Sequence, residues 1–205
     1  MSRIDESLSA DVRAYFGATG AGKTFNMLKD CEGARRVLAF DPKGTLGAQG
    51  FQAFHDFGQW LKAASGANEG RFAYQATGAA NFARFCEAVM AMADARRPAV
   101  VLVDELGNVT TPSKAPEHWH NVISLGRAMG LKIRAGAQRA PEIDKTLIGN
   151  KTHLWIGYQS RTADAQYLAK ETDVPVETIK ALRPKPHFDQ ILYLGRGDWK
   201  LIKGK

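Results

Sequence analysis

The residues with the clearest chemical potential form a glycine-rich octapeptide near the start of the chain. It matches the pattern G-x-x-x-x-G-K-[ST] at every position and consists of Gly17, Ala18, Thr19, Gly20, Ala21, Gly22, Lys23 and Thr24. In such a loop, glycines let backbone N–H groups surround phosphate oxygens, and the amino end of the next helix adds partial positive charge. We expect Lys23 to contact the β- and γ-phosphates and the Thr24 hydroxyl to bind Mg²⁺. The octapeptide therefore predicts a nucleoside triphosphate site, with ATP and Mg²⁺ as its ligands.

Two adjacent acids, Asp104 and Glu105, directly follow the unbroken apolar run 99–103. Such a run is typical of a strand that is buried on both faces. In a parallel sheet, the carboxyl end of that strand lies at the edge that carries the phosphate loop. We therefore expect Asp104 to hold the hydration shell of the metal and Glu105 to polarise an attacking water molecule.

Gln138 is a third candidate, because it follows the predicted strand 131–137 and is expected at the same edge. Its amide could contact the γ-phosphate or the attacking water. A GTPase is excluded, since the segment 150–153 (Asn-Lys-Thr-His) lacks the aspartate of N-K-x-D that would accept hydrogen bonds from guanine. A small phosphotransferase stays open, although no convincing arginine-rich lid is present.

Strand-like and helix-like segments alternate along most of the chain, and this alternation would position these residues. The pattern predicts an α/β fold of the P-loop NTPase type, with a mainly parallel sheet, helices on both faces and a C-terminal β-hairpin. We expect one domain over residues 1–205, with 1–11 as a flexible N-terminal segment. The predicted strands are 12–16, 37–40, 51–55, 71–75, 99–103, 131–137, 152–157, 190–194 and 199–202, and the longer predicted helices are 56–64 with Asp56 as its N-cap, 81–97 and 116–129.

The charge balance and the cysteines of the chain indicate the kind of partner and the compartment. The chain has 28 Lys and Arg against 21 Asp and Glu, a net charge of +7 that favours a polyanion. Cys31 and Cys86 have neither disulfide-framework nor metal-site spacing, which indicates reduced, buried thiols in a cytosolic compartment. We find no signal segment and no apolar run long enough to span a membrane.

Four features together resemble the FtsK/HerA superfamily of DNA-pumping P-loop ATPases. They are the loop 17–24, the acids after 99–103, the helix end at Gly126-Arg127, and the strand end at 138–141 (Gln-Arg-Ala-Pro). The small size, the turn 41–44 and the stretch 150–168 look most like the genome-packaging ATPases of membrane-containing icosahedral viruses. The resemblance covers about residues 12–202 and implies a RecA/FtsK-like sheet.

The resemblance implies an ATP-hydrolysing motor that translocates double-stranded DNA, packaging a viral genome into a preformed capsid. It implies a homo-oligomeric ring, often hexameric, in the cytoplasm of the host cell or at a virion vertex, next to a capsid or membrane-associated viral protein. Lys23, Thr24, Asp104, Glu105 and Gln138 fall on motif positions of the family. For the arginine that reaches a neighbouring subunit, Arg127, Arg134 and Arg139 all lie in the right stretch. Arg127 is preferred because a helical wheel places it at the flank of an apolar stripe, near His120.

The DNA-facing residues are less well defined by the sequence. The loop 107–115 is the first choice because it follows the acidic pair, and the basic candidates are Lys43, Lys114, Arg196, Lys200, Lys203 and Lys205. One alternative is a filamentous-phage assembly or export ATPase of the Zot type, which acts on a protein partner and commonly carries a transmembrane span. The other alternative is a small phosphotransferase.

Overall fold

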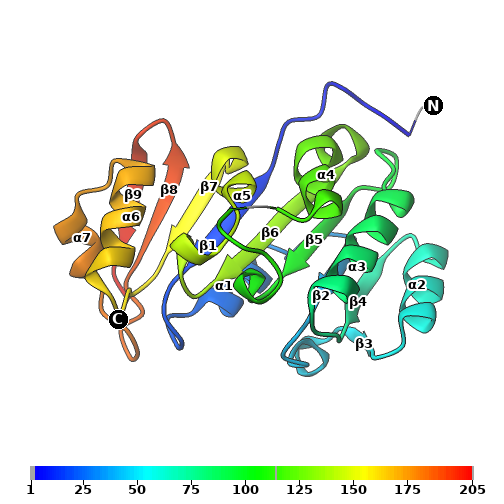
Figure 1. The fold of residues 1–205 in the computed structure, drawn as a ribbon, viewed down its shortest axis with the longest axis horizontal. Helices are drawn as coiled ribbons and strands as arrows, with labels where there is room; N and C mark the ends of the chain where they lie inside the picture. Colours follow the sequence, from blue (N-terminus) through cyan, green and yellow to red (C-terminus); the bar gives the residue numbers. More distant parts are fainter. Residues whose placement is uncertain (1–2, 114, 205) are drawn as a thin grey trace.

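The computed structural model describes residues 3–113 and 115–204, and in these residues nine strands form one sheet (Figure 1). The strands are β1 (Val12–Phe16), β2 (Arg36–Phe40), β3 (Gln52–Phe54), β4 (Gly70–Tyr74), β5 (Ala99–Val103), β6 (Leu131–Ala137), β7 (His153–Ile156), β8 (Gln190–Gly195) and β9 (Asp198–Ile202). The helices are α1 (Lys23–Lys29), α2 (Phe57–Gly66), α3 (Ala79–Met92), α4 (Glu117–Leu125), α5 (Lys145–Asn150), α6 (Thr162–Thr172) and α7 (Val176–Lys180). The predicted strand segments are all present, with boundaries shifted by at most one residue.

The sheet has the strand order β3-β4-β2-β5-β6-β1-β7-β8-β9. Every pairing from β3 to β7 is parallel, whereas β8 pairs antiparallel with β7 and with β9. This confirms the predicted mainly parallel sheet with a C-terminal hairpin. The carboxyl ends of β1, β2, β5 and β6 therefore share one edge, and their amino ends share the opposite edge.

Two apolar clusters cover the two faces of the sheet. The larger one joins β-strand residues such as Phe40 and Val101 to side chains of α2 to α6, including Trp60 and Trp119. The smaller one includes Met27 of α1. Figure 1 shows α3, α4 and α5 in front of the sheet and α1 behind it. Burial on both faces explains why the central strands are almost continuously apolar.

The helix predicted over 81–97 is α3, which begins at Ala79 and ends at Met92. Arg96 and Arg97 therefore lie beyond the end of this helix. The backbone turns extended at Ala93, and the Asp94 carboxylate bonds to the backbone and guanidinium of Arg96. The guanidinium of Arg3 instead donates to the carbonyls of Ala91 and Ala93 and complements the carboxyl end of α3.

Other local expectations are confirmed. Asp56 is the N-cap of α2, and its carboxylate accepts from the Gln59 N–H at 2.8 Å. Cys31 and Cys86 are buried free thiols, and burial raises the pKa of Cys31 to about 11. Within 3–113 and 115–204, no helix is both long and apolar enough to cross a membrane.

The segment 3–11, whose flexibility the sequence predicts, runs along α4 and the short 3₁₀ turn Gly126–Met129. The Asp5 N–H donates to the Ala128 carbonyl, and Arg127 donates to the carbonyls of Glu6 and Leu8. Flexibility of this segment stays a prediction, and its motion would have to break these bonds.

Candidate nucleotide site

The phosphate loop joins β1 to α1 at the carboxyl edge of the sheet. Gly20 and Gly22 have φ of 78° and 95°, in the left-handed region that glycine adopts without strain. This backbone turns the chain directly into α1, whose first N–H groups have no carbonyl partner within the helix. Unpaired N–H groups at the start of a helix suit phosphate oxygens.

Lys23 is enclosed by this loop and is only 7% exposed. Its Nζ donates to the Gly17 carbonyl at 2.8 Å. Burial lowers the pKa of Lys23 below its usual range, while the nearby Glu105 and Asp104 oppose that shift. Desolvation therefore disfavours the ammonium, and an anionic phosphate beside it would compensate for the lost hydration.

Thr24 and Asp104 meet although they are far apart in the sequence. The Thr24 hydroxyl donates to Asp104 Oδ2 at 3.0 Å, and Asp104 is 2% exposed. Asp104 Oδ1 accepts from the Glu105 N–H at 3.0 Å. A hydroxyl and a carboxylate side by side are hard oxygen donors, and Mg²⁺ in phosphate sites uses few such protein ligands. The donor set present therefore fits Mg²⁺.

Glu105 forms an ion pair that the sequence did not predict. Lys43 Nζ lies 2.5 Å from Glu105 Oε1, and Glu105 is 6% exposed. The backbone of Glu105 has φ 57°, which is uncommon for a non-glycine residue and is typical of functional sites. Lys43, proposed from the sequence as a DNA contact, thus lies at the nucleotide site, because β2 is the neighbour of β5 in the sheet.

Gln138 lies where its strand position predicts. It follows β6 at the carboxyl edge, is exposed, and its Oε1 accepts from the Thr19 hydroxyl at 3.3 Å. Arg139, the next residue, binds the buried carboxylate of Asp164 and also contacts Glu142. The structure therefore brings Gln138 to the phosphate loop. Arg139, in contrast, forms ion pairs with carboxylates of its own chain.

A cavity of about 350 Å³ opens beside the phosphate loop, lined by loop residues together with Lys43 and Glu105. Phe25 and Phe188 also line it and are 71% and 41% exposed. Phe188 approaches Gly22 so closely that a Cβ there would lie 3.6 Å from its ring. Sequence analysis missed both aromatic residues. Phe25 could have been suspected from its place next to Thr24, but Phe188 comes from the distant segment before β8.

The structure does not bring Arg127 and Arg134 to this edge. Arg127 precedes β6 and binds Glu6 at 2.8 Å, whereas Arg134 is a buried residue of β6 that pairs with Asp11 at 2.7 Å. Both lie toward the amino edge, the opposite side of the sheet from the phosphate loop within one chain.

The other sequence-derived DNA candidates lie away from the nucleotide. Arg196, Lys200 and Lys203 are exposed on or after the terminal hairpin. Lys114 and Lys205 lie outside the described residues. In the loop 107–115, Thr110 is buried and donates to the Leu106 carbonyl, while Ser113 is exposed.

Comparison with solved structures identifies the fold. The genome packaging NTPase B204 from Sulfolobus turreted icosahedral virus 2, in complex with AMPPCP, superposes with a TM-score of 0.78 over 96% of this chain and 98% of that one, at 11% identity. The DNA-packaging ATPase B204 from Sulfolobus Turreted Icosahedral Virus gives a TM-score of 0.74 over 95% and 98%, also at 11% identity. Fold and site together define a P-loop NTPase with the architecture of viral genome-packaging NTPases.

Sequence comparison adds the family. Protein P9 of Pseudoalteromonas phage PM2 is 30% identical over 189 residues, which cover 91% of this chain and 86% of P9. The chain belongs to the same family as protein P9. No family model matches the sequence.

Proposed function

We propose that this protein is a magnesium-dependent ATPase that moves double-stranded DNA into a preformed viral capsid. The observation that carries the proposal is the meeting of Lys23, Thr24, Asp104, Glu105 and Gln138 at one sheet edge. The sequence similarity to a phage protein and the fold shared with viral packaging NTPases support DNA as the cargo. The net charge of +7 agrees with a polyanionic partner.

Each residue at the edge has a distinct role in the proposed reaction. The loop N–H groups and Lys23 hold the phosphates and neutralise their charge. Thr24 and Asp104 would hold Mg²⁺, which would neutralise charge on the phosphate oxygens. Glu105 accepts a proton from the attacking water, and Gln138 orients that water. Phe25 and Phe188 offer apolar ring faces on which the nucleobase can lie.

We propose further that the protein works as a homo-oligomeric ring, with a hexamer as the expected form, acting in the host cytoplasm at a capsid vertex. An arginine from a neighbouring subunit would complete each site, and Arg127 is the candidate. Because Arg127 lies toward the amino edge of its own sheet, it can act only if one subunit presents that edge to the nucleotide of the next. The Glu6 contact of Arg127 would have to open.

The proposal is tested by measuring ATP hydrolysis with and without long duplex DNA, at low and moderate salt, with Lys23→Ala as the blank. We expect hydrolysis that needs Lys23 and Mg²⁺, rises with DNA, and loses the DNA-dependent increase as salt rises, because phosphate contacts release counterions.

The other outcomes separate the alternatives. Lys23-dependent hydrolysis that ignores DNA at every protein concentration would contradict DNA translocation and favour an assembly or export ATPase that acts on a protein. Phosphate transfer that requires a small-molecule acceptor would indicate a phosphotransferase. The DNA used should be long and of mixed sequence, so that neither length nor base content limits the response.

A further inference from the structure

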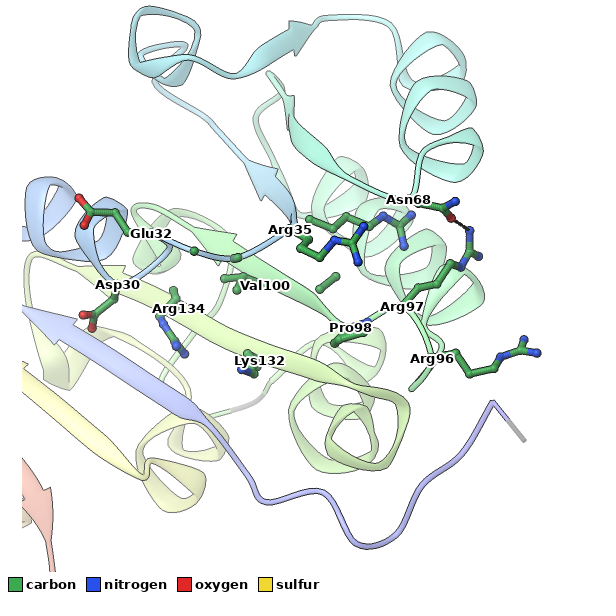
Figure 2. Close-up of a pocket in the computed structure, with 14 residues that line it drawn as sticks. Asp30, Glu32, Arg35, Asn68, Arg96, Arg97, Pro98, Val100, Lys132 and Arg134 are labelled. Carbon is green, nitrogen blue, oxygen red and sulfur yellow. Dashed lines mark hydrogen bonds between the residues drawn. The ribbon is translucent and has the colours of Figure 1, made fainter. Parts of the chain in front are cut away.

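A second cavity, of about 620 Å³, lies at the amino edge of the sheet, opposite the edge that carries the phosphate loop (Figure 2). Val100 lines it from the start of β5, whereas Asp104 follows the other end of the same strand. The cavity is basic: its lining contains six cationic and two acidic side chains, namely Arg35, Arg36, Arg96, Arg97, Lys132 and Arg134 against Asp30 and Glu32.

The charges in this cavity are not evenly mixed. Figure 2 shows Arg35, Arg97 and Asn68 gathered at one end, while Asp30 and Glu32 lie at the other. Asp30 is engaged by Arg13 at 2.9 Å. The cationic end is therefore not neutralised by the acids that share the cavity.

Several cations at this site have no ion-pair partner among the described residues: Arg36, Arg97 and Lys132. Three nearby carboxylates are already engaged, since Asp94 binds Arg96 at 2.5 Å, Asp11 binds Arg134 at 2.7 Å and Glu69 lies 3.7 Å from Arg35. The Arg97 guanidinium donates to Asn68 Oδ1 at 3.3 Å, and this is its one hydrogen bond to a described residue.

Arg36 gives the strongest evidence that an anion binds in this cavity. It is 1% exposed, its Nη2 donates to the Ala64 carbonyl at 2.6 Å, and its Nε has no hydrogen-bond partner in the described part of the chain. Burial and the neighbouring Arg97 lower the pKa of Arg36 below its usual range. Arg134 Nε is likewise buried without a partner. Arg134 pairs with Asp11 through its Nη atoms, whereas Arg36 has no ion-pair partner among the described residues. A buried guanidinium without a counter-charge is costly unless an anion meets it.

We infer that this amino-edge cavity binds phosphate groups of the DNA backbone. Guanidinium groups suit phosphate oxygens because they donate in a planar fork. The lining contains no aromatic side chain, so the cavity offers no surface for stacking a base. It is thus built for a sugar–phosphate backbone of any sequence rather than for a free nucleotide. The choice of DNA as the source of the phosphate rests on the proposed function.

The test replaces two accessible cations and keeps the buried ones. In the variant Arg97→Gln/Lys132→Gln, both changes lie at the cavity surface, while Arg36, whose loss could unfold the protein, stays in place. The matched control Lys62→Gln/Lys170→Gln removes the same charge from exposed positions of α2 and α6, outside the cavity. Thermal unfolding checks that both variants fold, and fluorescence anisotropy of a labelled mixed-sequence duplex measures binding.

We expect the cavity variant to bind DNA about 10-fold more weakly than the control. Its plot of log Kd against log salt should be shallower by about one unit for each DNA phosphate that the cavity no longer neutralises. Equal binding by the two variants overturns the inference and leaves the proposed function intact. A wild-type protein that binds no DNA overturns both.

Inorganic pyrophosphate, added to Lys23→Ala so that the phosphate loop is disabled, is the second arm of the test. If pyrophosphate raises Tm only when Arg97 and Lys132 are present, and DNA binding does not differ between the cavity variant and its control, the cavity binds small phosphates instead. That result overturns the assignment of the cavity to the DNA backbone.

Discussion

At the scale of single residues, the most consequential contact is the ion pair between Lys43 and Glu105. The Lys43 ammonium holds the Glu105 carboxylate at 2.5 Å, at the mouth of the nucleotide cavity. A carboxylate that is to accept a proton from water must point at that water, and small misplacement of such a group costs much of the rate. Lys43 is therefore expected to act as a positioning residue for Glu105.

For Lys43→Met we predict a kcat for ATP hydrolysis about 10-fold lower, because Glu105 loses the partner that orients it. Lys43→Arg keeps a cation in place and should retain more activity. Binding of a fluorescent ATP analogue should change less than kcat. A variant that loses affinity while kcat is unchanged would show that Lys43 serves the nucleotide directly and not Glu105.

His153 predicts how stability depends on pH. Burial and the nearby Arg13 lower the pKa of His153 below its usual value of about 6.5. The unfolded chain therefore binds a proton that the folded chain resists, and stability rises with pH between the lowered folded pKa and the unfolded one. We expect Tm to fall on acidification from about pH 7 to about pH 5.5, and His153→Gln to flatten this dependence. An unchanged slope in the variant would assign the pH dependence to other groups.

At the scale of elements, α4 and α5 are joined by one buried carboxylate. Asp144 is fully buried, caps α5 by accepting from the Thr146 and Leu147 N–H groups, and accepts from Trp119 Nε1 at 3.1 Å. The side chain thus satisfies the start of one helix and the indole of another. This contact also fixes the segment that connects Gln138 to β7.

We predict that Asp144→Ala lowers the free energy of unfolding by about 2–4 kcal/mol, because it removes a helix cap and leaves the indole N–H buried without a partner. Asp144→Asn keeps an acceptor oxygen and should cost less. Urea unfolding measures both variants. If Asp144→Ala is as stable as the wild type, neither the cap nor the Trp119 bond stabilises the fold.

At the scale of the whole molecule, the two edges of the sheet carry different chemistry. The carboxyl edge holds the nucleotide residues, and the amino edge holds the basic cavity and Arg127. In a ring in which one subunit's amino edge faces the next subunit's nucleotide, Arg127 would complete the site in trans. Such a ring would have a mass about six times the 22.4 kDa of the chain.

Mixing two inactive variants tests this arrangement. We predict that Arg127→Ala lowers hydrolysis by about 10³-fold and that mixing it with Lys23→Ala restores part of the activity, because some interfaces then combine an intact phosphate loop with an intact arginine. Arg139→Ala and Arg134→Ala are the comparison variants, judged by hydrolysis and by the mass of the assembly. Rescue by mixing with Arg139→Ala but not with Arg127→Ala would transfer the trans role to Arg139.

Much of this protein follows from the sequence by itself. The phosphate loop is contiguous, so its eight residues define its backbone chemistry, and an apolar run such as 99–103 predicts a buried strand with Asp104 and Glu105 at its end. These features depend on neighbours along the chain, and the structure agrees with them. The sequence did not predict that α3 ends at Met92. The helical pattern continues beyond Met92, but the Asp94 carboxylate bonds to Arg96 and the Arg3 guanidinium bonds to the Ala91 carbonyl, and these contacts favour the end of the helix.

Tertiary structure alone decided which distant residues complete each site. Lys43 meets Glu105 because β2 lies next to β5, and Phe188 reaches Gly22 because the chain returns before β8. The basic cavity gathers the amino ends of β2, β5 and β6 with their connecting loops. Strand order results from packing the whole chain around one sheet, and no local pattern encodes it. For that reason the sequence predicts the chemistry of each segment, whereas only the folded structure shows which segments lie side by side.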